Sequence, residues 1–205
     1  KQYSTYVEQA LTEEGYQVAH SIIDMSHFGI PQNRKRFILV AMKGHDPKRV
    51  FAVLAENRAA FCKEKGIMCT TSVRDAISDL EKSCGTVPSP DTKGFNAGIY
   101  GAIQSGYQKL MRQKLSTDTR VVNSHRFVNH RADTVKLHED LLRTAPRGKR
   151  ITPTDGIVDN LNRRGVTVLD PNSQSPTITS IPDELVHYCC LLYTSPSPRD
   201  PKTSR

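Results

Sequence analysis

Residues 29–42 read GIPQNRKRFILVAM, in which a turn, a polar cationic loop and an apolar run follow one another directly. Pro31 fixes its own backbone and disfavours the α region for Ile30, so the first residues predict a turn. The apolar residues 37–42 have the length of a strand and show no alternation, which predicts a strand buried on both faces of a sheet. The stretch therefore predicts a loop that carries its charges into a core strand.

The residues before this stretch predict a helix and a second strand. Apolar residues recur at helical spacing in 5–11 until Gly15 ends the run, and 16–23 have the composition of a strand. The connection from 16–23 to 36–42 is too short for a parallel crossover, so we expect the two strands to pair antiparallel. Helix, strand, loop and strand in this order are typical of an α/β domain.

The character of the chain changes after Gly44, and residues 46–188 predict a looser α+β lobe. One helix should begin where Ser72 caps the Asp75 amide. Residues 83–98 hold two prolines and three glycines, which predicts an irregular loop, and 166–188 predict extended chain. The expected helices lie in 50–62, 72–80, 99–114, 134–144 and 154–161.

Composition indicates the class of partner and excludes a membrane span. The chain has 29 Lys and Arg against 21 Asp and Glu, a net charge of +8, which favours a polyanionic partner. No apolar run approaches the roughly 18 residues that a membrane span needs. The five cysteines show no metal-ligand or disulfide spacing, so we expect buried or incidental thiols in a reducing, cytoplasmic compartment and no metal site.

The cationic loop predicts an anion-binding site. Gln32, Arg34 and Arg36 are spaced two residues apart, so on extended backbone their side chains lie on the same side. Two guanidinium groups and an amide at the end of a core strand suit paired hydrogen bonds to phosphate or carboxylate. For a generic Gln-x-Arg-x-Arg pattern, the alternative is a solvated charge cluster at the start of an edge strand.

Two other cationic segments lead to predictions that differ from that for the cationic loop. Residues 143–150 read RTAPRGKR, where Arg147, Lys149 and Arg150 either contact DNA phosphates or form a solvated loop. On the helix expected in 99–114, Lys109, Arg112 and Lys114 predict an ordinary solvated face, with Tyr107, Leu110 and Met111 on the apolar face.

Five stretches, in order, resemble the DNA (cytosine-5)-methyltransferase family. Residues 14–42 resemble the region of its eighth conserved motif, which is Gln-x-Arg-x-Arg after a Gly-(Val/Ile)-Pro lead. Three others are 72–80 (VRDAI-DL), 107–112 (YQ-x-x-MR) and 123–148 (NH…R…P-x-G). The last, residues 175–179, resembles the ninth motif, and residues 181–188 resemble its usual continuation. The resemblance covers residues 1–188, and it is the ordered set that makes it specific.

The resemblance implies a fold and a division of the chain. It implies the C-terminal part of a Rossmann-like methyltransferase fold that uses S-adenosylmethionine, with a mixed α+β target-recognition lobe. Residues 1–45 would end the catalytic domain, and 46–188 would form the target-recognition region and return to the catalytic domain. Residues 191–205 resemble a translated sequencing adapter, so 189–205 are expected to be an artefact tail, with a natural disordered tail as the alternative.

The resemblance also implies roles for particular residues. Arg36 would contact the flipped cytosine and Arg34 the DNA backbone, both supporting catalysis, while Gln32 orders the loop. Ser175, Thr177 and Thr179 would help to set the recognition region and bring hydroxyl groups to phosphate; a turn that packs the domain is the alternative. The implied partner is double-stranded DNA, read by a monomeric enzyme of restriction-modification or host methylation.

Several family features are absent from the sequence. There is no Gly-rich cofactor loop, no Pro-Cys nucleophile and no Glu-Asn-Val segment, and the chain begins at Lys1 within an expected helix. We therefore expect a fragment that is inactive alone, contributes no cofactor-binding residue, and belongs to an enzyme whose other part binds S-adenosylmethionine. The alternatives are a tRNA cytosine-5 methyltransferase, a non-catalytic DNA-binding module and an unrelated basic α/β domain.

Overall fold

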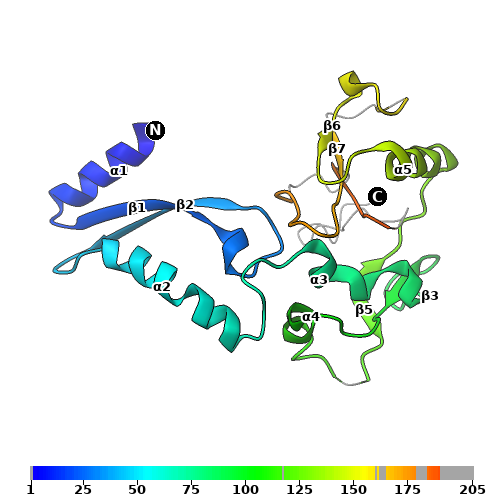
Figure 1. Cartoon of the computed structure of the whole chain (residues 1–205), viewed down its shortest axis with the longest axis horizontal. Coiled ribbons are helices and arrows are strands. Elements are labelled where there is room, and N and C mark those ends of the chain that lie inside the picture. Colours follow the sequence, from blue (N-terminus) through cyan, green and yellow to red (C-terminus); the bar gives the residue numbers. More distant parts are fainter. Residues whose placement is uncertain (1, 117, 160, 162–164, 179–183, 190–205) are drawn as a thin grey trace.

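The computed structural model describes residues 2–116, 118–159, 161, 165–178 and 184–189, and Figure 1 shows their arrangement. The chain begins with α1 (Gln2–Glu13), β1 (Gln17–Asp24), β2 (Lys35–Met42) and α2 (Lys48–Glu64). The two helices lie on opposite sides of the β1–β2 hairpin in the view of Figure 1. The described strands form one two-stranded and two three-stranded sheets, which together with the helices make a mixed α/β architecture, as predicted.

The β1–β2 hairpin has the predicted antiparallel pairing. Its register runs from Gln17 opposite Met42 to Asp24 opposite Lys35. At the end where residues 25–34 connect the two strands, Asp24 caps the 3₁₀ turn η1 (Met25–Phe28), and Gly29 ends that turn with a φ of 77°, which a residue with a side chain rarely adopts. The local sequence therefore sets both the strand pair and the turn that leads to the cationic loop.

The prediction that β2 is buried on both faces is wrong for the described structure. No residue of β2 is fully buried, and Phe37 is 50% exposed beside its cross-strand partner Ile22, which is 67% exposed. The cause is the width of the sheet, because it has only two strands within the described residues and one face near Phe37 is not covered. The apolar run therefore predicts a strand that other elements can bury, but the described residues of this chain do not bury it fully.

Two short helices each begin at a serine cap. The helix predicted from Ser72 is present as α3 (Val73–Ile77) followed by the 3₁₀ turn η2 (Ser78–Leu80), with the Asp75 amide donating to Ser72 Oγ at 3.1 Å. Helix α4 (Gly106–Met111) is shorter than the predicted 99–114, because Ser105 caps it. Its buried residue is Gln108, and Met111 is 56% exposed, so the predicted apolar face is wrong at Met111, whereas Tyr107 and Leu110 are partly buried.

Residues 83–98 form a hairpin and not the predicted irregular loop. After the 3₁₀ turn η3 (Lys82–Cys84), β3 (Thr86–Pro88) pairs with β4 (Asn96–Ile99), which pairs with β5 (Val121–Arg126). Pro88 ends an edge strand, where a missing amide hydrogen removes no bond from the centre of the ladder. Gly98 is required because a Cβ there would clash with the ring of His125, which lies against β4.

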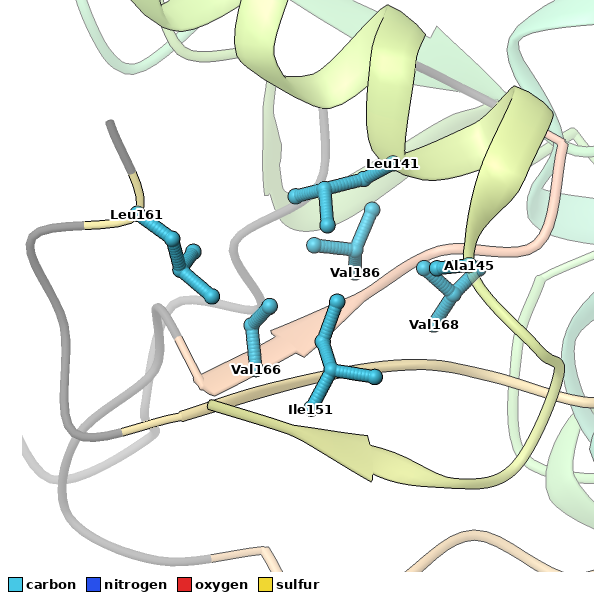
Figure 2. Packing of buried hydrophobic residues seen from close by; sticks show 7 residues of the cluster. All are labelled: Leu141, Ala145, Ile151, Leu161, Val166, Val168 and Val186. Atoms are coloured by element: carbon cyan, nitrogen blue, oxygen red, sulfur yellow. The ribbon is translucent and has the colours of Figure 1, made fainter. Parts of the chain in front are cut away.

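The apolar core lies between α5 (Ala132–Thr144) and the third sheet, which contains β6 (Arg150–Ile151), β7 (Val166–Val168) and β8 (Leu185–Val186). Leu137, Leu141 and Leu142 of α5 pack there, with Leu141 only 1% exposed. The helix predicted in 154–161 is reduced to the 3₁₀ turn η4 (Pro153–Asp155). Figure 2 shows the buried cluster: Leu141, Ala145, Ile151, Leu161, Val166, Val168 and Val186.

The buried His125 makes stability depend on pH. Burial lowers its pKa from 6.5 to about 4, and nearby His187 adds to this effect, while Nε2 lies 3.0 Å from the Leu80 carbonyl oxygen. As pH falls below 6.5 the unfolded chain takes up the proton first, so stability is lost until about pH 4. We expect the free energy of unfolding to fall by about 2 kcal/mol from pH 7 to pH 5 through this group.

Urea unfolding of the chain and of His125→Gln at both pH values measures this contribution. The variant should show a smaller difference between pH 7 and pH 5 than the unchanged chain. Equal pH dependence of the two proteins would show that His125 is not the responsible group.

Candidate functional site

The cationic loop and the start of β2 alternate in exposure as the spacing predicts. Gln32, Arg34 and Arg36 are partly buried, whereas the residues between them are exposed. Arg34 Nη1 donates to Gln32 Oε1 at 3.4 Å, and Arg36 Nη1 donates to the Lys35 carbonyl oxygen at 2.8 Å. Among the described residues, the side chains of the two arginines, which we call the arginine pair, thus make only weak or local contacts, and they keep donors for an external group.

A distant segment, residues 174–177, pairs with the cationic loop, and we call it the return segment. Gln32 and Ser175 form a parallel bridge, in which the Asn33 amide donates to the Ser175 carbonyl oxygen at 2.8 Å. The Ser175 amide donates to the Pro31 carbonyl oxygen at 3.0 Å. The return segment therefore fixes the backbone immediately before the arginine pair.

Side chains of the return segment strengthen this attachment. Thr177 Oγ1 donates to the Asn33 carbonyl oxygen at 2.7 Å, and Gln174 Nε2 donates to the Ser26 carbonyl oxygen at 3.1 Å. Ser175 Oγ donates to the Pro176 carbonyl oxygen at 2.8 Å. Because the hydroxyl protons of Ser175 and Thr177 are directed to backbone carbonyls, the geometry favours a structural role for both. Their contact with DNA stays a prediction, and Thr179 lies outside the described residues.

The bond from Thr177 to the loop gives a stability prediction. We expect Thr177→Val to lower the free energy of unfolding by about 1 kcal/mol, because the Asn33 carbonyl loses its side-chain donor. Thr177→Ser keeps the hydroxyl group and should lose much less. Urea titration of both variants checks this, and an equal loss in the two would contradict the assignment to the hydroxyl hydrogen bond.

The second cationic segment lies at the start of β6, away from the β1–β2 hairpin in Figure 1. Arg150 pairs with Glu184 at 3.2 Å, and Arg147 donates to the Leu142 carbonyl oxygen at 3.2 Å. Lys149 is exposed. The structure thus places Arg147, Lys149 and Arg150 together but does not bring them to the arginine pair, and Arg150 already has a carboxylate partner.

The predicted solvated face of α4 is wrong at Arg112. Its guanidinium forms an ion pair with Asp79, donates to the Gly101 carbonyl oxygen at 3.0 Å and lies 4.1 Å from the centre of the Tyr100 ring. The exposed fractions of the Arg112 and Asp79 side chains are 16% and 4%. Burial raises the pKa of Asp79, although Arg112 opposes this. The family resemblance could have pointed to this ion pair, because Asp79 and Arg112 both lie in stretches that resemble family motifs.

Further contacts join these same two stretches. Gln108 Nε2 donates to Ser78 Oγ at 2.9 Å, and Ser105 Oγ donates to the Asp75 carbonyl oxygen at 2.5 Å. Residues 72–80 and 105–112 therefore form one polar-bonded unit. The side chains of these two stretches therefore hold their backbones next to each other within the lobe.

The described thiols that have a resolved shift are not activated nucleophiles. Burial and contact with Cys69 raise the pKa of Cys62 to about 11, and burial raises the pKa of Cys84. An activated cysteine has a lowered pKa, so both thiols have the opposite character. Cys190 lies outside the described residues. Across the described residues, no group of three or more His, Cys, Asp or Glu side chains is arranged to hold a metal ion.

Membrane insertion by a helix is not supported by the structure. None of the helices in the described part of the chain has both the length and the apolar character needed to cross a bilayer.

Comparisons with known proteins identify the family of the chain. The Type II methyltransferase M.MspI of Moraxella sp is 61% identical over 33 residues, which are 16% of this chain and 8% of that protein. The chain thus spans a small share of the length of this curated relative. The family model described as C-5 cytosine-specific DNA methylase matches residues 2–179, which is most of the chain. The chain therefore belongs to the C-5 cytosine-specific DNA methylase family.

Proposed function

We propose that this chain is part of an enzyme that methylates C5 of cytosine in duplex DNA and uses S-adenosylmethionine as methyl donor. The observation that carries the proposal is the arginine pair at the start of β2, held by the return segment. S-adenosylmethionine supplies the methyl group when bound, and this chain supplies the groups that hold the target nucleotide.

The chemistry of the target explains why an arginine pair suits it. A cytosine within a duplex is shielded by stacking, so an enzyme that modifies it must rotate the nucleotide out of the helix. The extruded base needs donors for its O2 atom, and its strained backbone needs positive charge. Guanidinium groups supply both, because they stay charged and donate two hydrogen bonds in one plane. We assign Arg36 to the base and Arg34 to the phosphate.

The fixed backbone before the arginine pair makes this placement effective. Donors that are already oriented need not be ordered when the nucleotide arrives, so more of the binding energy remains for the complex. The bridge between Gln32 and Ser175 and the bond from Thr177 to Asn33 supply this order. In this assignment Gln32, Ser175 and Thr177 position the arginine pair.

The nucleophile and the cofactor site belong, in this proposal, to a part of the enzyme outside these residues. Methyl transfer to C5 requires a thiolate that attacks C6, and the raised pKa values of Cys62 and Cys84 oppose that role. The exposed apolar pair Ile22 and Phe37 offers a surface on which further elements of a Rossmann-like sheet can pack. Residues 1–45 then complete the catalytic domain, and the chain alone is inactive.

Residues 46–188 supply target recognition in this proposal. The net charge of +8 favours phosphate contact, and exposed Lys149 and Arg147 are better placed for it than Arg150, which pairs with Glu184. The whole enzyme acts as a monomer in the cytoplasm, within restriction-modification or host methylation. Thr179 remains assigned to DNA by its place in the ninth motif alone.

The proposal is tested by joining the chain to the N-terminal half of a C-5 cytosine methylase and measuring methyl transfer. We expect transfer to duplex DNA, no transfer to tRNA and no transfer by the chain alone. Transfer to tRNA in preference to DNA would favour the RNA-modifying alternative. Tight DNA binding without transfer in any pairing would favour the non-catalytic binding module.

A further inference from the structure

The connector between α2 and α3, residues 65–71, holds one member of a pair of cysteines in contact. Cys62 lies in the last turns of α2 and is 2% exposed, and Cys69 follows in the connector. Cys69 Sγ lies 4.0 Å from the carbonyl oxygen of Arg58, one turn before Cys62, and the Cys69 thiol is close enough to Cys62 to raise the pKa of the Cys62 thiol. The Ile67 amide donates to the Cys62 carbonyl oxygen at 2.9 Å, which turns the connector back against the helix.

The same connector contacts the turn that leads to the arginine pair. The Gly29 amide donates to the Cys69 carbonyl oxygen at 2.8 Å. A Cβ at Gly29 would lie 2.5 Å from Ile67 Cδ1 and 3.2 Å from the Met68 carbonyl oxygen, so the two backbones are closely packed. The position of Cys69 is therefore coupled to the loop before β2.

We propose that Cys62 and Cys69 form a redox modification site, in which a peroxide oxidant converts the two thiols to an intramolecular disulfide that clamps the connector to α2. The inference does not depend on the proposed methylation. It rests on the contact between the thiols, the turn at Ile67 and the attachment of Gly29.

The reaction proceeds in two balanced steps. Cys69 is partly exposed, so its thiolate attacks hydrogen peroxide, forming a sulfenic acid and releasing hydroxide, which takes up the thiol proton to give water. The Cys62 sulfur then attacks the sulfenic sulfur, forming the S–S bond and releasing a second water. Together the thiols lose two protons and two electrons, and one peroxide becomes two waters. The high pKa of Cys62, about 11, keeps its thiol protonated at neutral pH and so assigns the first attack to Cys69.

The disulfide has two structural consequences. It closes a short loop in the unfolded chain, so the melting temperature should rise by roughly 5 °C. It also holds the Cys69 carbonyl oxygen in place, so exchange of the Gly29 amide hydrogen with solvent should slow. A merely oxidised single thiol produces neither effect.

Peptide mapping of the full chain provides the test. Trypsin cuts at Arg58, Lys63, Lys65 and Arg74, which separates residues 59–63 with Cys62 from 66–74 with Cys69. After one equivalent of hydrogen peroxide, we expect these two peptides to be joined by a bond that a reductant cleaves. The same mapping is made in a variant with Cys84, Cys189 and Cys190 replaced by serine, in which both remaining thiols should disappear from a thiol titration.

Two further variants distinguish the outcomes. Cys62→Ser should leave Cys69 to oxidise to sulfenic acid, and to sulfinic acid with a second equivalent of peroxide, with no rise in melting temperature. Cys84→Ser should behave as the unchanged chain. The inference is overturned if unchanged protein yields sulfinic Cys69 beside a free Cys62 thiol, or if the two cysteines join only between separate chains. Because the mapping is also made on the unsubstituted chain, misfolding of a variant does not remove the test.

Discussion

Replacement of Arg36 by alanine is expected to lower methyl transfer at least a hundredfold in an enzyme assembled from this chain and the N-terminal half of a C-5 cytosine methylase. A charged hydrogen bond contributes roughly 1.5–3 kcal/mol, and a hundredfold loss corresponds to about 2.7 kcal/mol, so the expected effect requires the Arg36 side chain to make more than one such bond to the flipped base. Among the described residues, the Arg36 side chain donates to the carbonyl oxygen of its neighbour Lys35, so the fold should survive. Steady-state methylation and thermal unfolding of the same samples separate the two effects.

The neighbouring side chains provide matched controls. Lys35 is exposed on the opposite side of the strand, so Lys35→Ala removes an equal charge and should change methylation little. Arg36→Lys keeps the charge without the planar pair of donors and should give an intermediate loss. Arg34→Ala should weaken DNA binding. It should also reduce the slope of log affinity against log salt concentration by about one, the amount expected for one lost phosphate contact. Full activity in Arg36→Ala, or an equal loss in Lys35→Ala, contradicts the assignment.

The second large effect concerns the stability of the recognition lobe. Replacement of Arg112 by alanine is expected to lower the free energy of unfolding by about 3–5 kcal/mol, because it leaves the Asp79 carboxylate buried without its partner. The Gly101 carbonyl oxygen and the Tyr100 ring lose contacts as well. Lys109→Ala, an exposed change on the same helix, should alter stability by no more than about 0.5 kcal/mol.

The effect should depend on pH in a defined direction. Burial raises the pKa of Asp79 above its ordinary value of 3.8, so its contribution to stability is greatest at low pH and is lost as pH rises through the folded value. Without Arg112 this pKa rises further, so Arg112→Ala should be less damaging at pH 4 than at pH 7.

A double variant provides the decisive control. Asp79→Leu with Arg112→Met replaces both charges by apolar groups and should recover much of the loss. Urea unfolding of the two single variants, the double variant and the unchanged chain gives the full cycle. If the double variant is as unstable as the sum of the singles, Arg112 acts through its other contacts and not through Asp79.

Local signals in the sequence predicted the elements that depend on neighbouring residues. The short connection between β1 and β2 allowed only antiparallel pairing, and Ser72 with Asp75 fixed the start of α3. The helix predicted in 134–144 is present as α5. In each case the residues that determine the outcome lie within a few positions of one another.

The elements that depend on distant partners were not predicted. The β3–β4 hairpin pairs with β5, beyond α4, so the prolines and glycines of 83–98 indicated turns without indicating the pairing. Arg112 looked like part of a solvated face because its partner Asp79 lies in another helical segment. The apolar run of β2 predicted burial that depends on strands beyond the two in this sheet.

The candidate site shows the same division. The two-residue spacing predicted a common side for Gln32, Arg34 and Arg36, and the alternation in exposure agrees. Periodicity gave no indication that the return segment pairs with this loop across 144 residues, as Thr177 does with Asn33. The family resemblance selected that segment, but its hydroxyl groups are directed to backbone carbonyls, which only the structure reveals.

The central claim is that the arginine pair holds a nucleotide rotated out of its duplex. After the target cytosine is mapped by bisulfite sequencing, the most direct measurement uses a duplex with 2-aminopurine at that position, whose fluorescence rises when the base leaves the stack. The enzyme assembled with the unchanged chain should produce that rise on binding, and the same enzyme with Arg34→Ala and Arg36→Ala should bind without it. An undiminished rise with both arginines replaced would contradict the claim.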